Sequence, residues 1–198
     1  MHSTDSEQSI EALENRAITA LRNYDGAGAL YLYKLLVKKG YKHAYCEIGN
    51  IYELGIGDVE TDYKQAFEWY MKSVDDGDDP LGAYCLGRFY YLGRGTPIDY
   101  EKAQWYYKLA ADSGVTIASL MLGRIYNLGL GINKDINEAR KHFQTAANEG
   151  YVYAIKNLGS LEISSGNIVK GILLYVKGMW AHLKLYISNK HDPRIRSA

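Results

Sequence analysis

The sequence has little that supports a secreted, glycosylated or membrane-spanning protein. Only two cysteines occur, Cys46 and Cys85, which are too few for a disulfide framework. No uncharged apolar run reaches the length of a membrane span. The first residues contain neither the basic nor the apolar segment of a secretory signal, and no Asn-x-Ser/Thr sequon is present. We therefore expect a cytoplasmic protein whose two cysteines are ordinary helix residues.

The motifs of the common catalytic and metal sites are also missing. The five histidines are dispersed, without H-E-x-x-H or Cys/His ligand spacing. No G-x-x-x-x-G-K-[ST] phosphate loop and no S-x-x-K occurs. The acidic run at residues 75–79 lacks the spacing of a calcium loop and is interpreted as a solvated turn. We expect no catalytic residues, no metal and no cofactor, and hence a protein that is not an enzyme.

Net charge is absent as well, since 23 basic residues balance 23 acidic ones. Nucleic-acid binding is therefore not expected. The two ends differ, however: the segment before Arg16 carries only acidic charges, whereas the segment from Ile168 onward carries six basic residues against Asp192. The asymmetry indicates a basic contact surface, head-to-tail association or two solvated ends.

What the chain does contain is a repeat. Four segments share one pattern, anchored by glycines 36 to 38 residues apart: AYCEIGNIYELGIG from Ala44, AYCLGRFYYLGRG from Ala83, ASLMLGRIYNLGLG from Ala118 and the degenerate AIKNLGSLEISSG from Ala154. A second periodic segment follows each copy, as in DINEARKHFQTAANEG after the third. A period of this length predicts stacked helix pairs that bury a core only against their neighbours.

The third copy shows how one unit is expected to fold. Apolar residues at helical spacing predict a first helix that ends at Gly129, because glycine favours the left-handed helix cap. Asp135, three residues before Glu138, predicts the N-cap of the second helix. In that helix Ala139 and Phe143 are expected to face inward, so that small residues allow close packing while aromatic residues fill the space between helices.

The combined pattern A-x-x-x-L-G-x-x-Y-x-x-G-x-G and D-x-x-x-A-x-x-(W/Y/F)-(Y/F)-x-x-A-A-x-x-G resembles the Sel-1-like repeat family, which is related to the tetratricopeptide repeats. The resemblance implies an all-α solenoid, a right-handed superhelix of about five antiparallel helix pairs with the first helices lining a concave face. It also implies an adaptor or scaffold that binds other proteins. Some members carry two cysteines per repeat, and this chain departs from that subgroup.

We expect one solenoid over residues 1–198. Its predicted parts are a degenerate N-terminal helix pair (1–43), three well-formed repeats (44–81, 82–117 and 118–153), a degenerate repeat with a long C-terminal helix (154–187) and a flexible basic tail (188–198).

Under the family's geometry, one helix face left free by the apolar stripe lines the concave groove. Its residues are Asn50, Glu53, Tyr84, Arg88, Tyr91, Arg124 and Asn127. Arginine forks bind carboxylates, so a protein or peptide partner with acidic groups is the predicted ligand. Alternatively, Arg88 and Arg124 are solvated or paired with acidic neighbours such as Glu53.

The C-terminal helix is a second candidate interface. Apolar residues including Met179 and Trp180 fall on one broad face, and Lys170, Lys177 and Lys184 recur seven residues apart outside it. Three interpretations remain open: a hydrophobic cap on the solenoid, a homodimer or partner interface, and a helix lying on an anionic membrane surface.

Overall fold

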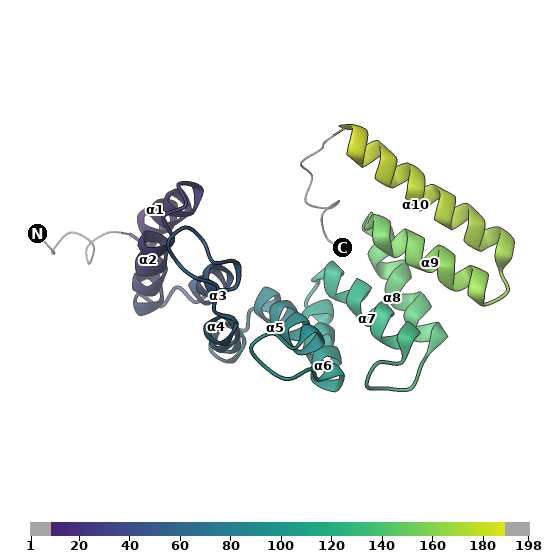
Figure 1. Ribbon diagram of the computed structural model, residues 1–198, viewed down its shortest axis with the longest axis horizontal. Coiled ribbons are helices and arrows are strands. Elements are labelled where there is room, and N and C mark those ends of the chain that lie inside the picture. Colours follow the sequence, from purple (N-terminus) through teal and green to yellow (C-terminus); the bar gives the residue numbers. More distant parts are fainter. Residues whose placement is uncertain (1–8, 189–198) are drawn as a thin grey trace, which may run out of the picture. The chain divides into compact units, whose positions relative to one another are not determined.

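Residues 9–188, the part of the chain described by the computed structural model, form ten α-helices and no β-strand (Figure 1). The prediction of an all-α fold built from repeated helix pairs is confirmed. The described helices fall into two compact units, residues 9–99 and 100–188. The single solenoid over the whole chain stays a prediction, and the predicted tail beyond Ser188 lies outside the described residues.

The first unit contains five helices, which are two helix pairs and the first helix of a third repeat. Their bounds are α1 (Ile10–Arg22), α2 (Gly26–Lys38), α3 (Ala44–Leu54), α4 (Tyr63–Asp75) and α5 (Pro80–Leu92). Each helix packs against the next along the chain.

The second unit contains the other five. Their bounds are α6 (Tyr100–Asp112), α7 (Thr116–Leu128), α8 (Ile136–Asn148), α9 (Val152–Ser164) and α10 (Ile168–Ser188). Here too, successive helices pack against one another.

Within a repeat, a glycine on the first helix meets an aromatic ring on the second. A Cβ atom at Gly49 would lie 2.6 Å from the Tyr70 ring, and one at Gly123 would lie 2.5 Å from the Phe143 ring. Both rings are buried, which contributes about 2 kcal/mol each through removal of apolar surface from water. Packing therefore explains why glycine recurs at this position of the repeat: a residue larger than glycine would clash with the ring.

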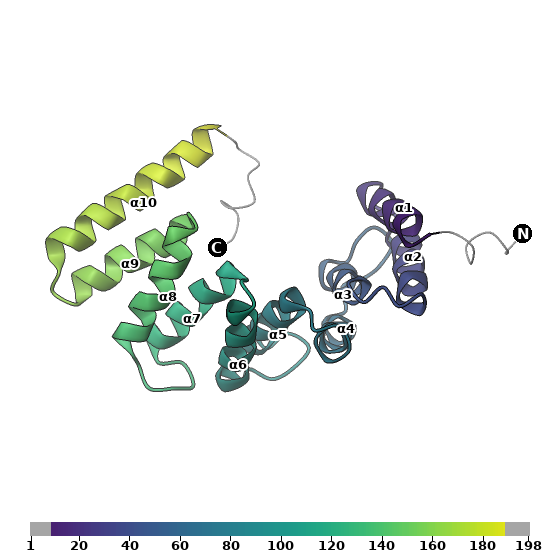
Figure 2. The same ribbon diagram turned by 180° about the vertical axis from the view of Figure 1, so that it is seen from behind.

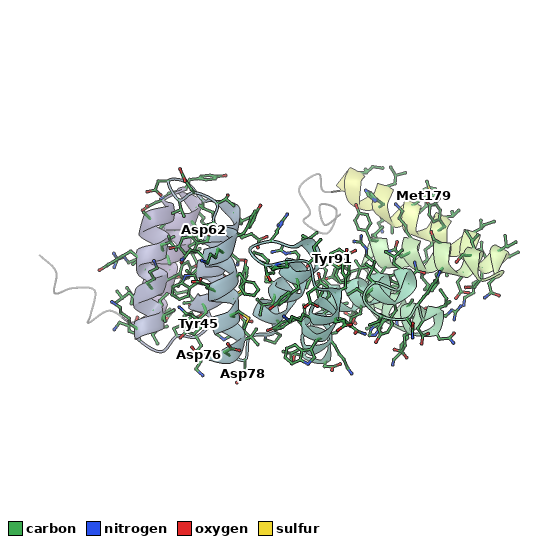
Figure 3. All side chains as sticks on the ribbon, turned by 60° about the horizontal axis from the view of Figure 1, so that its bottom comes forward. Tyr45, Asp62, Asp76, Asp78, Tyr91 and Met179 are labelled. Carbon is green, nitrogen blue, oxygen red and sulfur yellow. The ribbon has the colours of Figure 1, made fainter. Side chains whose placement is uncertain are left out.

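The predicted helix ends are present in the structure. Asp62 caps α4 through Lys64 N and Gln65 N (Figure 3), and Asp135 caps α8 through Asn137 N and Glu138 N at 2.9 and 3.0 Å. The first glycine of each G-x-G pair is a left-handed C-cap; Gly129, for example, has a φ of 68°.

The second glycine of each pair contacts the repeat before it. A Cβ at Gly57 would lie 1.8 Å from Tyr24 O, one at Gly95 would lie 2.3 Å from Tyr63 O, and one at Gly131 would lie 2.8 Å from Tyr100 Cβ. All three glycines also have positive φ. The G-x-G pair is thus a cap followed by a contact with the preceding helix pair.

The last pair, α9 and α10, packs with its backbones unusually close. A Cβ at Gly171 would lie 2.7 Å from Gly159 O, and one at Gly178 would lie 2.7 Å from Lys156 Cγ. Figures 1 and 2 show α10 running alongside α9 and extending past it. The face of α10 that packs on α9 is therefore its glycine-containing face.

A pocket between α3 and α5

A pocket of about 340 Å³ lies between the first helices of two successive repeats in the first unit. Its position follows from the repeat, because α3 and α5 are equivalent helices and both contribute side chains to the pocket wall. The lining residues are His43, Cys46, Glu47 and Asn50 at α3, and Asp79, Leu81, Tyr84, Cys85 and Arg88 at α5.

A buried carboxylate, Glu53, organises one side of this pocket. Its side chain is only 4% exposed and forms ion pairs with Arg88 and with Arg94, the latter at 2.8 Å. The Tyr70 hydroxyl lies 2.8 Å from Glu53 Oε2 and equally close to Asn50 Oδ1. Burial, reinforced by the nearby Cys85 and Glu53, raises the pKa of Tyr70, so its hydroxyl stays protonated.

Two guanidinium groups therefore share one carboxylate. Arg88 and Arg94 remain 30% and 38% exposed, so both reach solvent while contacting Glu53. Burial lowers the pKa of Arg88, but the nearby Cys85 and Glu53 raise it by more, so the pKa lies above its usual value. Two guanidinium groups and one carboxylate give the Glu53 cluster (Glu53, Arg88 and Arg94) one formal net positive charge.

The two cysteines both line the pocket and contact each other, although they lie 39 positions apart in sequence. Both thiols are free and buried. A hydrogen bond from Cys46 to Cys85, together with burial, raises the pKa of Cys46. The same hydrogen bond lowers the pKa of Cys85, and the positive Arg88 acts in the same direction against burial.

The structure distributes the predicted groove residues over several surroundings. Asn50, Tyr84 and Arg88 line the pocket, whereas Glu53 is buried behind it as the partner of Arg88. That pairing is the alternative that the sequence left open for Arg88. Tyr91, on α5, is half-buried and does not line the pocket (Figure 3).

Arg124 and Asn127 belong to α7 in the second unit. Arg124 is exposed and Asn127 is half-buried. A groove that joins these residues to Arg88 stays a prediction.

On α10, the predicted second interface is largely open to solvent. Met179 and Trp180 are 54% and 69% exposed (Figure 3 labels Met179). Lys170 lies 3.1 Å from the buried carboxylate of Glu162, while Lys177 and Lys184 are exposed.

Sequence reasoning missed several pocket residues. Glu47, Asp79 and Arg94 are charged groups at or beside the pocket that the groove prediction did not include. Asp79 had a recognisable signal, because an acidic residue before Pro80 is a typical helix start, and it does cap α5. The meeting of Cys46 with Cys85 had no such signal, since the two occupy different positions relative to their glycines.

Among the described residues, no group of three or more His, Cys, Asp or Glu side chains is placed to hold a metal ion. No helix of the described chain is long and apolar enough to cross a membrane. Repeated helix pairs of this kind define a helical-repeat protein.

The comparisons identify the repeat. A family model described as the Sel1 repeat matches residues 42–78, 80–115 and 116–151, more than half of the chain. The chain belongs to the Sel1 repeat family, whose members generally bind other proteins. No curated protein matches.

Solved structures agree on the fold. A Sel1 repeat protein from Oxalobacter formigenes is 26% identical, with a TM-score of 0.72 over 87% of this chain and 74% of that one. The protective antigen c5321 of uropathogenic Escherichia coli is 24% identical, with a TM-score of 0.77 over 93% of this chain but only 43% of its own. The immunity protein Pa5087 from Pseudomonas aeruginosa is 25% identical, with a TM-score of 0.54 over 87% and 66% of the two chains.

Proposed function

We propose that this chain is a non-catalytic adaptor or scaffold, and that a segment of a partner protein docks in the pocket between α3 and α5. The observation that carries the proposal is the pocket's lining. Leu81 is 56% exposed at its edge, and Tyr84 and Arg88 stand one turn apart on the same helix. Tyrosine and arginine are the residue types that contribute most at protein interfaces.

The charges favour one carboxylate in the partner rather than a uniformly acidic segment. The Glu53 cluster keeps one net positive charge, and Arg88 Nε is buried without a hydrogen-bond partner in the described part of the chain. Glu47 and Asp79 line the same pocket and would repel further negative charge. A partner side chain such as Asp or Glu beside Arg88, with donors facing Glu47, fits this distribution.

The wider groove remains part of the proposal. Tyr91, Arg124 and Asn127 are retained as candidate contact residues for a partner protein. We also propose a cytoplasmic location, which the two free thiols support. Nucleic acid is not a proposed ligand, since the chain has no net charge.

Site-specific photo-crosslinking tests the pocket. A photoreactive amino acid at position 84, introduced in the source cell, should yield a defined adduct with one protein. The same group at position 54, where Leu54 is 68% exposed on α3 outside the pocket, is the control and should not. The recovered partner can then be purified and its affinity measured.

The affinity measurement uses two matched variants. Leu81→Lys changes an exposed pocket residue and should weaken binding about tenfold or more. Leu54→Lys makes the same change outside the pocket and should leave affinity unchanged. Equal affinities for both variants, or adducts from both positions, would place the binding site elsewhere.

A further inference from the structure

The outer side of α10 is an apolar surface that no described helix covers. Four residues form a continuous line along it and are 46% to 74% exposed: Val169, Leu173, Val176 and Trp180. Leu183 and Ile187 extend the line to the end of the helix at 48% and 74% exposure. Single exposed apolar residues are common, but a line of this length on one helix marks an interaction surface.

Comparison with α8 inside the same unit shows that this surface is not a property of the repeat. Gly171 of α10 corresponds to Ala139 of α8. Each is a small buried residue that lies four positions before the residue in contact with the glycine on the first helix of its own pair. In this register the four apolar residues of α10 correspond to Asn137, Lys141, Gln144 and Asn148 of α8. All four residues of α8 are polar and exposed. The second helix α8 therefore presents polar side chains to water on this side, whereas α10 presents apolar ones.

Basic charge borders this apolar surface. Seven residues make about two helical turns, so Lys170, Lys177 and Lys184 form a row along one edge. Two hollows on α10 are each lined by apolar side chains together with two of these lysines: Lys170 and Lys177 in one, Lys177 and Lys184 in the other. The helix contains no Asp or Glu.

We propose that α10 docks the protein on an anionic lipid surface, with its apolar line in the acyl boundary and Lys177 and Lys184 at the headgroups. Lysine stems reach from an apolar surface to phosphate oxygens, and tryptophan favours the same interface. The hollows are lined by apolar side chains and by lysines, which matches an acyl chain joined to an anionic headgroup. Because α10 is too polar to cross a bilayer, it would lie in the plane of the membrane.

The charge distribution argues against a second copy as the occupant. A copy of α10 would bring apolar side chains but no carboxylate, and it would place a second lysine row near the first. A lipid surface supplies both the apolar layer and the negative charge, about 1 kcal/mol of attraction per lysine near it.

Vesicle co-sedimentation with the full chain tests this docking. Vesicles of phosphatidylcholine with phosphatidylglycerol should carry the protein down, vesicles of phosphatidylcholine alone should not, and added salt should weaken binding. Lys177→Glu/Lys184→Glu should reduce partitioning at least about tenfold. The matched control is Lys108→Glu/Lys141→Glu, which reverses two exposed lysines on α6 and α8 and should bind like wild type.

A second variant removes the apolar contribution without changing charge. Val176→Ser/Trp180→Ser alters only exposed side chains, so the protein should keep its helical circular dichroism and melting temperature while losing vesicle binding. The pocket variant Leu81→Lys should bind vesicles normally, which separates this proposal from the proposed protein-binding site.

Three results would overturn the proposal. The first is a wild-type protein that does not sediment with anionic vesicles. The second is a Lys108→Glu/Lys141→Glu control that loses as much binding as the α10 variant. The third is a dimer in sedimentation equilibrium that Val176→Ser/Trp180→Ser converts to monomer. The last result would assign the surface to a second copy.

Discussion

Gly57 lies against the backbone of Tyr24, so that a Cβ atom at Gly57 would sit 1.8 Å from the Tyr24 carbonyl oxygen. The residue also has a φ of +62°, a conformation that costs free energy for residues other than glycine. The backbone conformation and the contact with the preceding helix pair therefore both require glycine at this position.

Replacing Gly57 should be far more costly than replacing a glycine with the same conformation and open surroundings. We expect Gly57→Ala to lower the free energy of unfolding by about 3 kcal/mol or more, through left-handed strain plus the clash. Gly40 has a φ of +84°, and a Cβ added there would meet nothing within 4 Å, so Gly40→Ala should lose only about 1 kcal/mol. Urea unfolding followed by circular dichroism compares the two, and equal losses would contradict the contact with Tyr24.

The pairing of Arg88 with Glu53 predicts that the two groove arginines respond differently to charge reversal. Arg88→Glu would place a second carboxylate beside the buried Glu53, and we expect the first unit to lose about 3 kcal/mol or more. Contacts of exposed charged side chains contribute about 1 kcal/mol or less, so Arg124→Glu, which changes an exposed side chain, should lose less than Arg88→Glu does. The two melting curves, recorded at the same pH, give the comparison.

This difference matters for any binding experiment that uses these residues. Loss of a partner from an Arg88→Glu variant would report unfolding rather than recognition, whereas Leu81→Lys keeps the Glu53 cluster intact. If Arg88→Glu were as stable as wild type, the pairing with Glu53 would contribute little to the stability of the fold.

Glu162 predicts an acid-dependent loss of stability in the second unit. Hydrogen bonds from Asn167, Lys170 and Arg140 lower its pKa to about 2 despite burial. A folded pKa below the unfolded value stabilises the fold above about pH 4.5, and the stabilisation disappears as pH falls from 4.5 toward 2. The shift corresponds to about 3 kcal/mol at neutral pH.

Urea unfolding of wild type and Glu162→Gln at pH 7 and pH 3 measures this contribution. The variant should be less stable at pH 7 and should lose less stability on acidification than wild type does. Glu149→Gln, which changes an exposed carboxylate next to α8, should follow the wild-type pH dependence. An unchanged pH dependence in Glu162→Gln would show that the hydrogen bonds do not hold the carboxylate in its charged form.

The contact between Cys46 and Cys85 predicts that oxidation joins α3 to α5. Treatment with diamide should convert the two thiols to one intramolecular disulfide, the oxidant taking up two electrons and two protons. Closing a loop of this length should stabilise the first unit by about 4 kcal/mol. Thiol titration of the denatured protein and a melting curve record the result.

Cys85→Ser is the control, since it leaves Cys46 without its partner. It should keep its single thiol titratable and its melting temperature unchanged by diamide. A wild-type protein that forms intermolecular dimers in place of the internal bond would show that the thiols do not meet in solution.

Local features were predictable from the sequence because they depend on neighbours in the chain. Asp62 and Asp135 cap helices, and Gly55 and Gly129 end them, each within a few residues of the signal. The inward positions Ala139 and Phe143 also followed from helical periodicity alone, and both are buried.

Contacts between repeats could not be predicted in the same way. Whether Glu53 reaches Arg94 or Cys46 reaches Cys85 depends on how adjacent helix pairs are rotated, which a repeat length of 36 to 38 residues does not determine. The C-terminal helix gives a related lesson. Its broad apolar face suggested the packed side, yet α10 packs on α9 through Gly171 and Gly178 and leaves much of the apolar face in water.

The second glycine of each G-x-G pair has a consequence for exchanging parts between proteins of this kind. Position 95 has room only for glycine, because the backbone of Tyr63 in the preceding helix pair lies against it. Gly131 lies against Tyr100 in a similar way. A single repeat is therefore not the smallest transferable piece. A graft should carry the loop of one repeat together with the opening turn of the second helix before it, because those two segments were shaped against each other.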